Sequence, residues 1–387
     1  ADVYYKSATR QDGTIYYKYL LAYVDDLLCI SHEPSKDIDQ IDHYFKIKDN
    51  SRGVPKVYLG GQINAVTLSN NVRAWSFTSS KYVQDALHNI ERHIFTEYDM
   101  KLPTRVSTPC TSGYRPELDI SRELTDSRAV YFMSLIGILR WAVELGRIDI
   151  ETEVSKLSSF LAAPREGHLS QALHIFAYLK KHHNSGIVFD PTYPDINEDD
   201  FKTNDDWKYF YGDEGESLPP NMPPPLGKEV VIRCFVDADH AGDKITRRSR
   251  TGFIIFLNNA PIYWTSKKQN TCESSTFGSE LVAMKTATEY LRGLRYKLRM
   301  MGIPLSGPVY VYGDNMSVIH NTTAPESTLK KKHNSIAYHF VREGVARGEW
   351  LVTFIKSVNN PADILTKSLP QPQREFLLKL FMHYIYD

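Results

Sequence analysis

The amino-acid sequence predicts a multidomain α/β protein, and three regional patterns in its 387 residues support this assignment. Residues 1–78 contain segments rich in Tyr, Leu and Val, which are typical of strands. Residues 79–190 carry apolar side chains at helical spacing, and residues 230–387 alternate between strand-like and helical segments. Hydrophobic residues at 42% and charged residues at 24% exclude a wholly disordered chain, and the length allows two or three domains.

The first region, residues 1–78, combines strand-like segments with one short helix. Residues 15–30 form an apolar run that is interrupted by Asp25 and Asp26. A helix is expected from about Pro34 to Phe45. The remaining residues, 56–78, have the composition of short strands around Leu59-Gly60-Gly61 and an Asn70-Asn71 turn.

The second region, residues 79–190, is expected to be mostly helical. Leu135, Ile138, Leu139 and Ala142 show the spacing that places apolar side chains on one helix face. The same periodicity extends over four segments: Lys81–Ile94, Asp126–Gly146, Ile150–Leu161 and Leu169–His183.

An acidic, proline-rich segment at residues 191–229 separates this helical region from the last one. Between Asp195 and Glu216 nine acidic residues face only two basic ones, so this window has a net charge of −7 and the remainder of the neutral chain has +7. Five prolines follow within residues 219–225, as in an exposed, semi-rigid linker. Its aromatic residues favour the alternative of an insertion that packs on a domain; they are Trp207, Tyr209, Phe210 and Tyr211.

The last region, residues 230–387, is expected to form a mixed sheet flanked by helices. Three strands with tight connections are followed by a long amphipathic helix that includes Leu281 and Leu298. A short helix, a helix around 335–347 and a terminal helix complete the pattern. The five expected strands are Val230–Val236, Thr251–Leu257, Pro261–Thr265, Val309–Tyr312 and Trp350–Ile355.

Four acidic residues of this region lie where strands end or helices begin: Asp237, Glu280, Asp314 and Asp363. Acids at strand ends can converge on one point, where carboxylates repel one another unless cations lie between them. Mg²⁺ prefers oxygen ligands, and two such ions can activate a water molecule against a phosphodiester. The alternative is that each acid is an ordinary turn or cap residue.

Six ordered motifs resemble the ribonuclease H domain of copia-type LTR retrotransposons. They are FVDADHAG at 235–242, RSRTGF at 248–253, WTSKKQ at 264–269, SST at 274–276 with SEL at 279–281, GDN at 313–315 and ADILTK at 362–367. The resemblance implies a ribonuclease H-like mixed five-stranded sheet in residues 230–387. It also implies that Asp237, Glu280, Asp314 and Asp363 bind two Mg²⁺ ions, which Mn²⁺ can replace, for hydrolysis of the RNA strand of an RNA–DNA hybrid.

One element of that family is missing from this sequence. Many ribonucleases H carry a histidine shortly before the last aspartate, whereas residues 356–361 contain none. His333 and His339 are candidates to assist catalysis in its place, and the alternative is that both are ordinary surface histidines.

The first half of the chain resembles the same family's reverse transcriptase. YVDD at 23–26 is similar to the paired-aspartate hairpin of polymerase palms, and PKVYLGGQI at 55–63 to the segment that holds the primer. Residues 131–150 and 172–180 resemble the connecting helices. The resemblance implies an incomplete palm at 1–78, with Asp25 and Asp26 as catalytic residues and Asp25 as a metal ligand, and a helical thumb or connection region at 79–190. Because the fingers and a further catalytic aspartate have no counterpart here, we expect polymerase activity only in a full-length parent.

Basic residues gather beside three of the candidate metal ligands. They are expected to contact the phosphate backbone of a hybrid or primer–template without reading its sequence. Solvated basic loops are the alternative. The candidates are Lys244, Arg247, Arg248, Arg250, Lys267, Lys268, Lys330, Lys331 and Lys332. A further row on the long helix is expected to face solvent: Arg292, Arg295 and Arg299.

The leading hypothesis is therefore a retrotransposon reverse transcriptase and ribonuclease H fragment cut from a longer polyprotein. Its expected partners are RNA–DNA hybrid and primer–template, together with a missing fingers and palm portion, an integrase or a second copy of the chain. Four scattered cysteines and no apolar run near 20 residues favour a reducing compartment without membrane contact, namely cytoplasmic virus-like particles and the nucleus rather than secretion. The alternatives are a catalytically reduced remnant that only binds nucleic acid, and an integrase or transposase nuclease.

Overall fold

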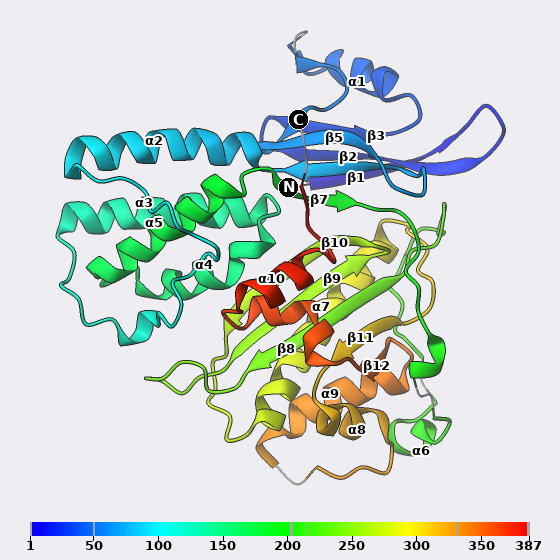
Figure 1. Cartoon of the computed structure of the whole chain (residues 1–387). Coiled ribbons are helices and arrows are strands. Elements are labelled where there is room, and N and C mark those ends of the chain that lie inside the picture. Colours follow the sequence, from blue (N-terminus) through cyan, green and yellow to red (C-terminus); the bar gives the residue numbers. More distant parts are fainter. Residues whose placement is uncertain (1, 49–50, 202–203, 214, 330–331, 385–387) are drawn as a thin grey trace.

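The computed structural model describes residues 2–48, 51–201, 204–213, 215–329 and 332–384, and Figure 1 shows the whole chain. The strands of these ranges form one sheet of three strands and two sheets of five strands. Within the same ranges, no helix has both the length and the apolar character needed to cross a bilayer.

The three-stranded sheet contains the interrupted apolar run of the first region. Strands β2 (Ile15–Tyr23) and β3 (Asp26–Ile30) form an antiparallel hairpin whose turn is Val24-Asp25. Strand β1 (Asp2–Thr9) pairs with β2, and helix α1 (Pro34–Asp42) follows the hairpin. Strand β1 is not among the predicted strands, because its side chains are mostly exposed and lack the alternation of a half-buried strand.

The second sheet joins strands from distant parts of the chain in the order β13-β7-β6-β5-β4. Its strands are β4 (Val57–Tyr58), β5 (Gly61–Thr67), β6 (Arg73–Thr78), β7 (Ser185–Phe189) and β13 (His383–Tyr384). Gly61 allows β5 to approach β6, since a Cβ atom there would lie 2.1 Å from the ring of Phe77. This sheet therefore connects the first region, the end of the helical region and the C-terminal segment.

The helical region has the expected helices and a core of its own. Apolar faces of four helices meet in that core: α2 (Ser80–Tyr98), α3 (Asp126–Glu144), α4 (Glu151–Leu157) and α5 (Glu166–Lys181). Between α3 and α4 a fully buried ion pair joins Arg147 to Asp149, with N–O distances of 2.7 and 2.9 Å.

The C-terminal sheet has the strand order β10-β9-β8-β11-β12. Its strands are β8 (Ile232–Asp239), β9 (Arg250–Leu257), β10 (Ala260–Lys268), β11 (Val309–Gly313) and β12 (Trp350–Phe354). The first three pair antiparallel, whereas β11 runs parallel to both β8 and β12. The predicted mixed five-stranded sheet is confirmed.

Helices cover both faces of this sheet (Figure 1). On one face, the core includes residues of α7 (Thr276–Met300), α8 (Met316–Thr323) and α9 (Ser335–Ala346). On the other face, α10 (Gln371–Leu378) contributes Leu377 to a core that also contains Ile148 and Ile187. The second face of the sheet is thereby packed against the helical region and the second sheet.

The acidic segment packs as an insertion against the C-terminal domain. Phe201 and Trp207, which begins helix α6 (Trp207–Tyr211), are both buried. Asp200 accepts a 2.6 Å hydrogen bond at its carbonyl from Thr353 of β12, and Pro191 accepts one of 3.0 Å from Asn258. Of the two alternatives for this segment, the structure shows the packed one.

The arginine row on α7 does not face solvent as expected. Glu216 of the insertion accepts hydrogen bonds of 2.6 and 2.8 Å from the buried Arg295, and of 2.5 Å from Arg299. Arg292 pairs with the buried Glu349 at 2.7 Å. The expectation was wrong because the acidic partners lie far from α7 in sequence.

The first prediction concerns this insertion. Glu216→Ala removes the carboxylate that faces the buried Arg295, and an uncompensated buried charge is unfavourable, so we expect a loss of about 2 kcal/mol in the free energy of unfolding. Glu289→Ala is the control, since it removes only the exposed pair of Glu289 with Lys285. Urea denaturation measures both variants, and equal stabilities would show that the insertion contributes nothing through Glu216.

Candidate metal centre

The parallel pairing of β8 and β11 brings two of the four predicted acids together. Phe235 lies opposite Tyr312 in the register of these strands, so Asp237 and Asp314 each follow two residues further along. Parallel strands end at the same edge of a sheet, which places the two side chains beside each other. Asp237 is completely buried, and Asp314 is half-buried just beyond β11.

Asp363 reaches the same edge from a short 3₁₀ helix, Pro361–Leu365. Asn360 caps this helix by accepting from the amide of Ala362 at 3.1 Å, and its side-chain amide donates to the carbonyl of Val236 at 3.0 Å. Gly252 of β9 allows the helix to lie against the sheet, because a Cβ atom there would lie 2.7 Å from Leu365 and Thr366. Asp363 is held beside Asp237 by these contacts of the 3₁₀ helix with β8 and β9.

The three aspartates form one acidic cluster. Carboxylate oxygens of Asp237, Asp314 and Asp363 all lie within 4.8 Å of one another. Glu280, near the start of α7, is buried and lies close enough for its titration to depend on these charges, although it is not one of the trio. Burial, followed by the charges of Asp237 and Asp314, raises the pKa of Glu280 to about 10. Burial and the charge of Asp237 raise the pKa of Asp363 to about 7.

Three further residues hold the cluster in place. Lys367 Nζ lies 3.1 Å from carboxylate oxygens of both Asp237 and Asp363. Thr366 donates a hydrogen bond to Asp237, and Ser357 donates one of 2.6 Å to Asp314. Although burial disfavours its ammonium group, the carboxylates of Asp237 and Asp363 raise the pKa of Lys367.

Sequence reasoning assigned these three residues no role. Thr366 and Lys367 stand within the ADILTK motif, and the four-residue spacing of Asp363 and Lys367 is a signal that could have indicated a salt bridge. The contact of Ser357 with Asp314 spans 43 residues and has no local signal.

The acidic cluster has the chemistry of a divalent-cation site. Its oxygen ligands come from three segments, and the raised pKa values of Glu280 and Asp363 reflect negative charge that Lys367 alone does not offset. Hard cations such as Mg²⁺ bind such oxygen sets. The residues therefore fit a metal, and Asp237, Asp314 and Asp363 would hold it.

The predicted phosphate-binding residues have different surroundings. Lys244, Arg247, Arg248, Lys267 and Lys332 are exposed. Lys268 pairs with Asp243 at 2.5 Å, and the buried Arg250 donates to the hydroxyls of Ser155 and Ser266 at 2.9 and 3.1 Å. Lys330 and Lys331 lie outside the described residues.

The two candidate histidines have different contact partners. A 2.7 Å hydrogen bond joins His339 Nδ1 to the hydroxyl of Tyr211, so His339 is engaged by the insertion. His333 Nε2 lies 3.3 Å from a carboxylate oxygen of Glu273, a residue on the segment that leads into α7. Neither contact is with a member of the acidic cluster.

Asp25 and Asp26 are exposed at the tip of the β2–β3 hairpin. Val24 precedes them with a φ of 54° and is almost fully exposed. Within the described ranges, the group of three or more acids that could hold a metal is the one in the C-terminal domain, and the hairpin tip is not part of it.

Comparison with known proteins confirms the resemblance to retrotransposon Pol polyproteins. No family model matches the chain. It is 26% identical over 354 residues to the retrovirus-related Pol polyprotein from transposon RE1 of Arabidopsis thaliana, covering 91% of this chain and 20% of that protein. It is 25% identical over 385 residues to the corresponding polyprotein from transposon TNT 1-94 of Nicotiana tabacum, covering 98% of this chain and 25% of that protein. The chain thus spans a fifth to a quarter of the length of these relatives.

Among solved structures, the ribonuclease H1 of Halobacterium salinarum is similar to the C-terminal part. It is 13% identical, and the alignment covers 36% of this chain and 95% of that one, with a TM-score of 0.27. The strand order and the acidic cluster described above are observed in the structure of this chain and do not depend on this similarity.

The second prediction tests the charge balance of the cluster. Lys367→Met leaves Asp237 and Asp363 without their cation, so we expect the free energy of unfolding in EDTA to fall by about 2 kcal/mol. Millimolar Mg²⁺ is expected to restore most of this loss, because a bound cation takes over the compensation. Thermal melts with and without Mg²⁺ measure the effect, and the exposed Lys379→Met is the control. A loss that is identical in both buffers would contradict the cation site.

Proposed function

We propose that this chain is the region of a copia-type Pol polyprotein that hydrolyses the RNA strand of RNA–DNA hybrids with Mg²⁺. The observation that carries the proposal is the acidic cluster of Asp237, Asp314 and Asp363 at the shared end of two parallel strands. The ordered sequence motifs contain one further carboxylate, Glu280, which we assign to the same site. Similarity over most of the chain to Pol polyproteins supports the same assignment.

The chain's own residues orient the carboxylates for this chemistry. When bound, Mg²⁺ lowers the pKa of a coordinated water and neutralises charge on a phosphodiester. Thr366 and Ser357 donate to Asp237 and Asp314 and so fix which carboxylate oxygens face the centre. Manganese, which also accepts oxygen ligands, can replace magnesium in such a set.

Exposed cations around the centre are suited to holding the hybrid by its backbone. Lys244, Arg247 and Arg248 lie on the loop between β8 and β9, and Lys267 lies near the end of β10. Contacts from lysine and arginine to phosphate are independent of base sequence, which suits an enzyme that acts along a hybrid. Selection of RNA then rests on the shape of the minor groove and on 2′-hydroxyl groups.

The first half of the chain is proposed to be the second half of a reverse-transcriptase palm, residues 1–78, with a thumb or connection region at 79–190. The exposed β2–β3 hairpin with Asp25 and Asp26 is the feature that supports this. This first half would hold primer–template beside the nuclease domain, within a cytoplasmic virus-like particle. Residues 230–387 form the proposed nuclease domain.

The third prediction tests the nuclease. Asp314→Asn removes one ligand charge while it preserves the shape of the side chain, so cleavage of a labelled RNA–DNA hybrid in Mg²⁺ should fall by about 100-fold or more. Asp85→Asn, an exposed change on α2, is the matched control and should retain wild-type cleavage. Hybrid binding without cleavage by the wild-type protein would instead favour the alternative of a catalytically reduced remnant.

The fourth prediction concerns polymerisation. A palm site needs a further carboxylate beside Asp25 and Asp26, and none of the described residues completes such a trio at the hairpin tip. With dNTPs, Mg²⁺ and an RNA template with a DNA primer, this chain alone should give no extension product on a denaturing gel. Efficient extension that Asp25→Asn abolishes would show that the chain contains a complete polymerase site.

A further inference from the structure

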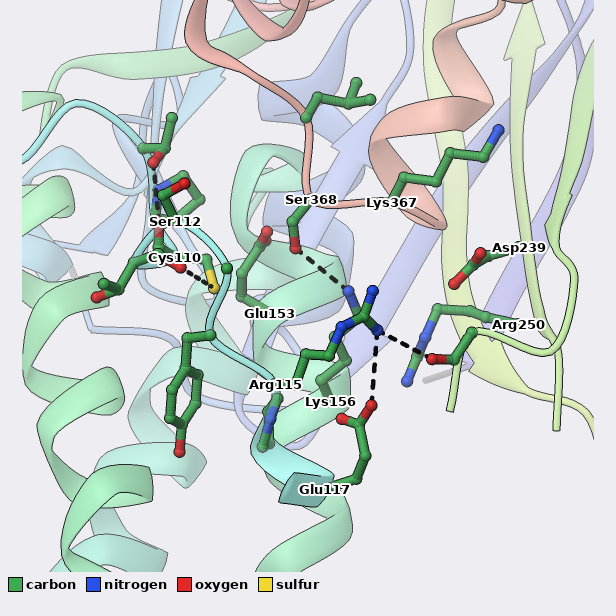
Figure 2. A pocket seen from close by; sticks show the side chains of 18 of the residues that line it. Cys110, Ser112, Arg115, Glu117, Glu153, Lys156, Asp239, Arg250, Lys367 and Ser368 are labelled. Atoms are coloured by element: carbon green, nitrogen blue, oxygen red, sulfur yellow. Dashed lines mark hydrogen bonds and ion pairs between the residues drawn. The ribbon is translucent and has the colours of Figure 1, made fainter. Parts of the chain in front are cut away.

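A cleft of about 500 Å³ lies between the helical region and the C-terminal domain (Figure 2). One wall is the loop at 107–117 together with α4, and the other comes from the ends of β8 and β10, the start of β9 and the segment 367–374. Asp239 and Lys367 belong to its lining, so the cleft opens next to the acidic cluster. Of the exposed cations assigned to the hybrid backbone above, Arg248 lines this cleft, whereas Lys156 and Arg374 have no role in that assignment.

The lining of the cleft is predominantly basic. Seven lysine and arginine side chains line it, against four acidic ones. Two of the acids are already paired: Glu117 lies 3.6 Å from Arg115, and Asp243 lies 2.5 Å from Lys268. Lys367 pairs with Asp237 and Asp363 of the acidic cluster, and the remaining basic residues are Lys156, Arg248, Arg250 and Arg374.

Part of the Arg374 guanidinium in the cleft lacks hydrogen-bond acceptors. Arg374 is only 2% exposed, and its Nε and Nη2 atoms are buried without a hydrogen-bond partner. Arg250 donates to the neutral hydroxyls of Ser155 and Ser266, and Lys156 Nζ lies 3.3 Å from the hydroxyl of Ser368. Unpaired buried donors are costly, and an anion with several oxygens would satisfy them.

Burial disfavours the charge of Lys156 in the cleft. It lowers the pKa of Lys156, and although Glu153 opposes this effect, the neighbouring guanidinium of Arg250 adds to it. Burial in turn raises the pKa of Glu153, so this carboxyl group is a weak counter-ion. A bound phosphate would place a negative charge beside Lys156 and Arg250.

We propose that this cleft binds a backbone phosphate of the nucleic-acid strand that enters the acidic cluster. The proposal rests on the proposed function, because a phosphodiester chain reaching Asp237 must leave the centre along one of its flanks. Lys367 contacts the cluster and also lines the cleft, which makes this flank continuous with the centre. Residues of the helical region, above all Lys156 of α4, then hold the strand while the C-terminal domain acts on it.

The fifth prediction tests this strand-binding role. Lys156→Met should weaken binding of a fluorescent RNA–DNA hybrid in EDTA by about 5- to 10-fold at 50 mM KCl. It should also reduce the slope of log Kd against log salt concentration by about 1, because one phosphate contact is lost. Arg248→Met, at an exposed position, should act in the same direction and does not depend on the fold tolerating a change at Lys156. The exposed Lys297→Met on α7 is the matched control, with an expected change below about 2-fold.

The outcomes separate this proposal from the nuclease assignment. If wild-type protein cleaves hybrid but folded Lys156→Met and Arg248→Met both keep the wild-type salt slope, the cleft proposal is overturned and the nuclease stands. If the slope falls for both variants while wild-type protein cleaves nothing, the cleft is supported and the nuclease fails. If inorganic phosphate raises the melting temperature of wild-type protein but not of Lys156→Met, while the salt slopes are equal, the cleft takes a free phosphate and the strand assignment is overturned.

Discussion

Repulsion among carboxylates at one sheet edge is the constraint on which the rest of the C-terminal domain depends. Asp237, Asp314 and Asp363 would move apart if their backbones were free to do so. The parallel register of β8 and β11, the cap formed by Asn360 and the close approach at Gly252 prevent this. The fold thus keeps negative charge crowded at a place where cations and phosphates can meet it.

The C-terminal segment connects this centre to the remainder of the molecule. The same stretch that supplies Asp363 continues into α10, whose Leu377 packs in a core shared with Ile148 and Ile187. It ends at β13, which pairs with β7 in the second sheet. A segment of about 25 residues therefore links the centre to both regions of the first half. It also provides Ser368 and Arg374 to the cleft between the helical region and the C-terminal domain.

The neutral net charge of the chain results from segregated charges of opposite sign. Part of the negative charge of the acidic insertion is neutralised by α7, where Glu216 pairs with Arg295 and Arg299. Lys156 and Arg248 form no close ion pair among the described residues, and they line the cleft that opens next to the carboxylate cluster. Neutrality is consequently no argument against binding to nucleic acid.

The sequence by itself determined the helices of the middle region and the five strands of the C-terminal sheet, because the periodicity of apolar residues is a local property. It also determined the four candidate metal-binding acids, since their positions at the ends of strands and helices are local as well. Motif order supplied the family resemblance. Only the tertiary structure decided which partners the buried charges have. The contacts of Lys367 with Asp237, of Glu216 with Arg295 and of Ser357 with Asp314 join residues that are 43 to 130 positions apart. Strands β7 and β13 were missed for the same reason, since each is stabilised by pairing with strands that are distant in sequence.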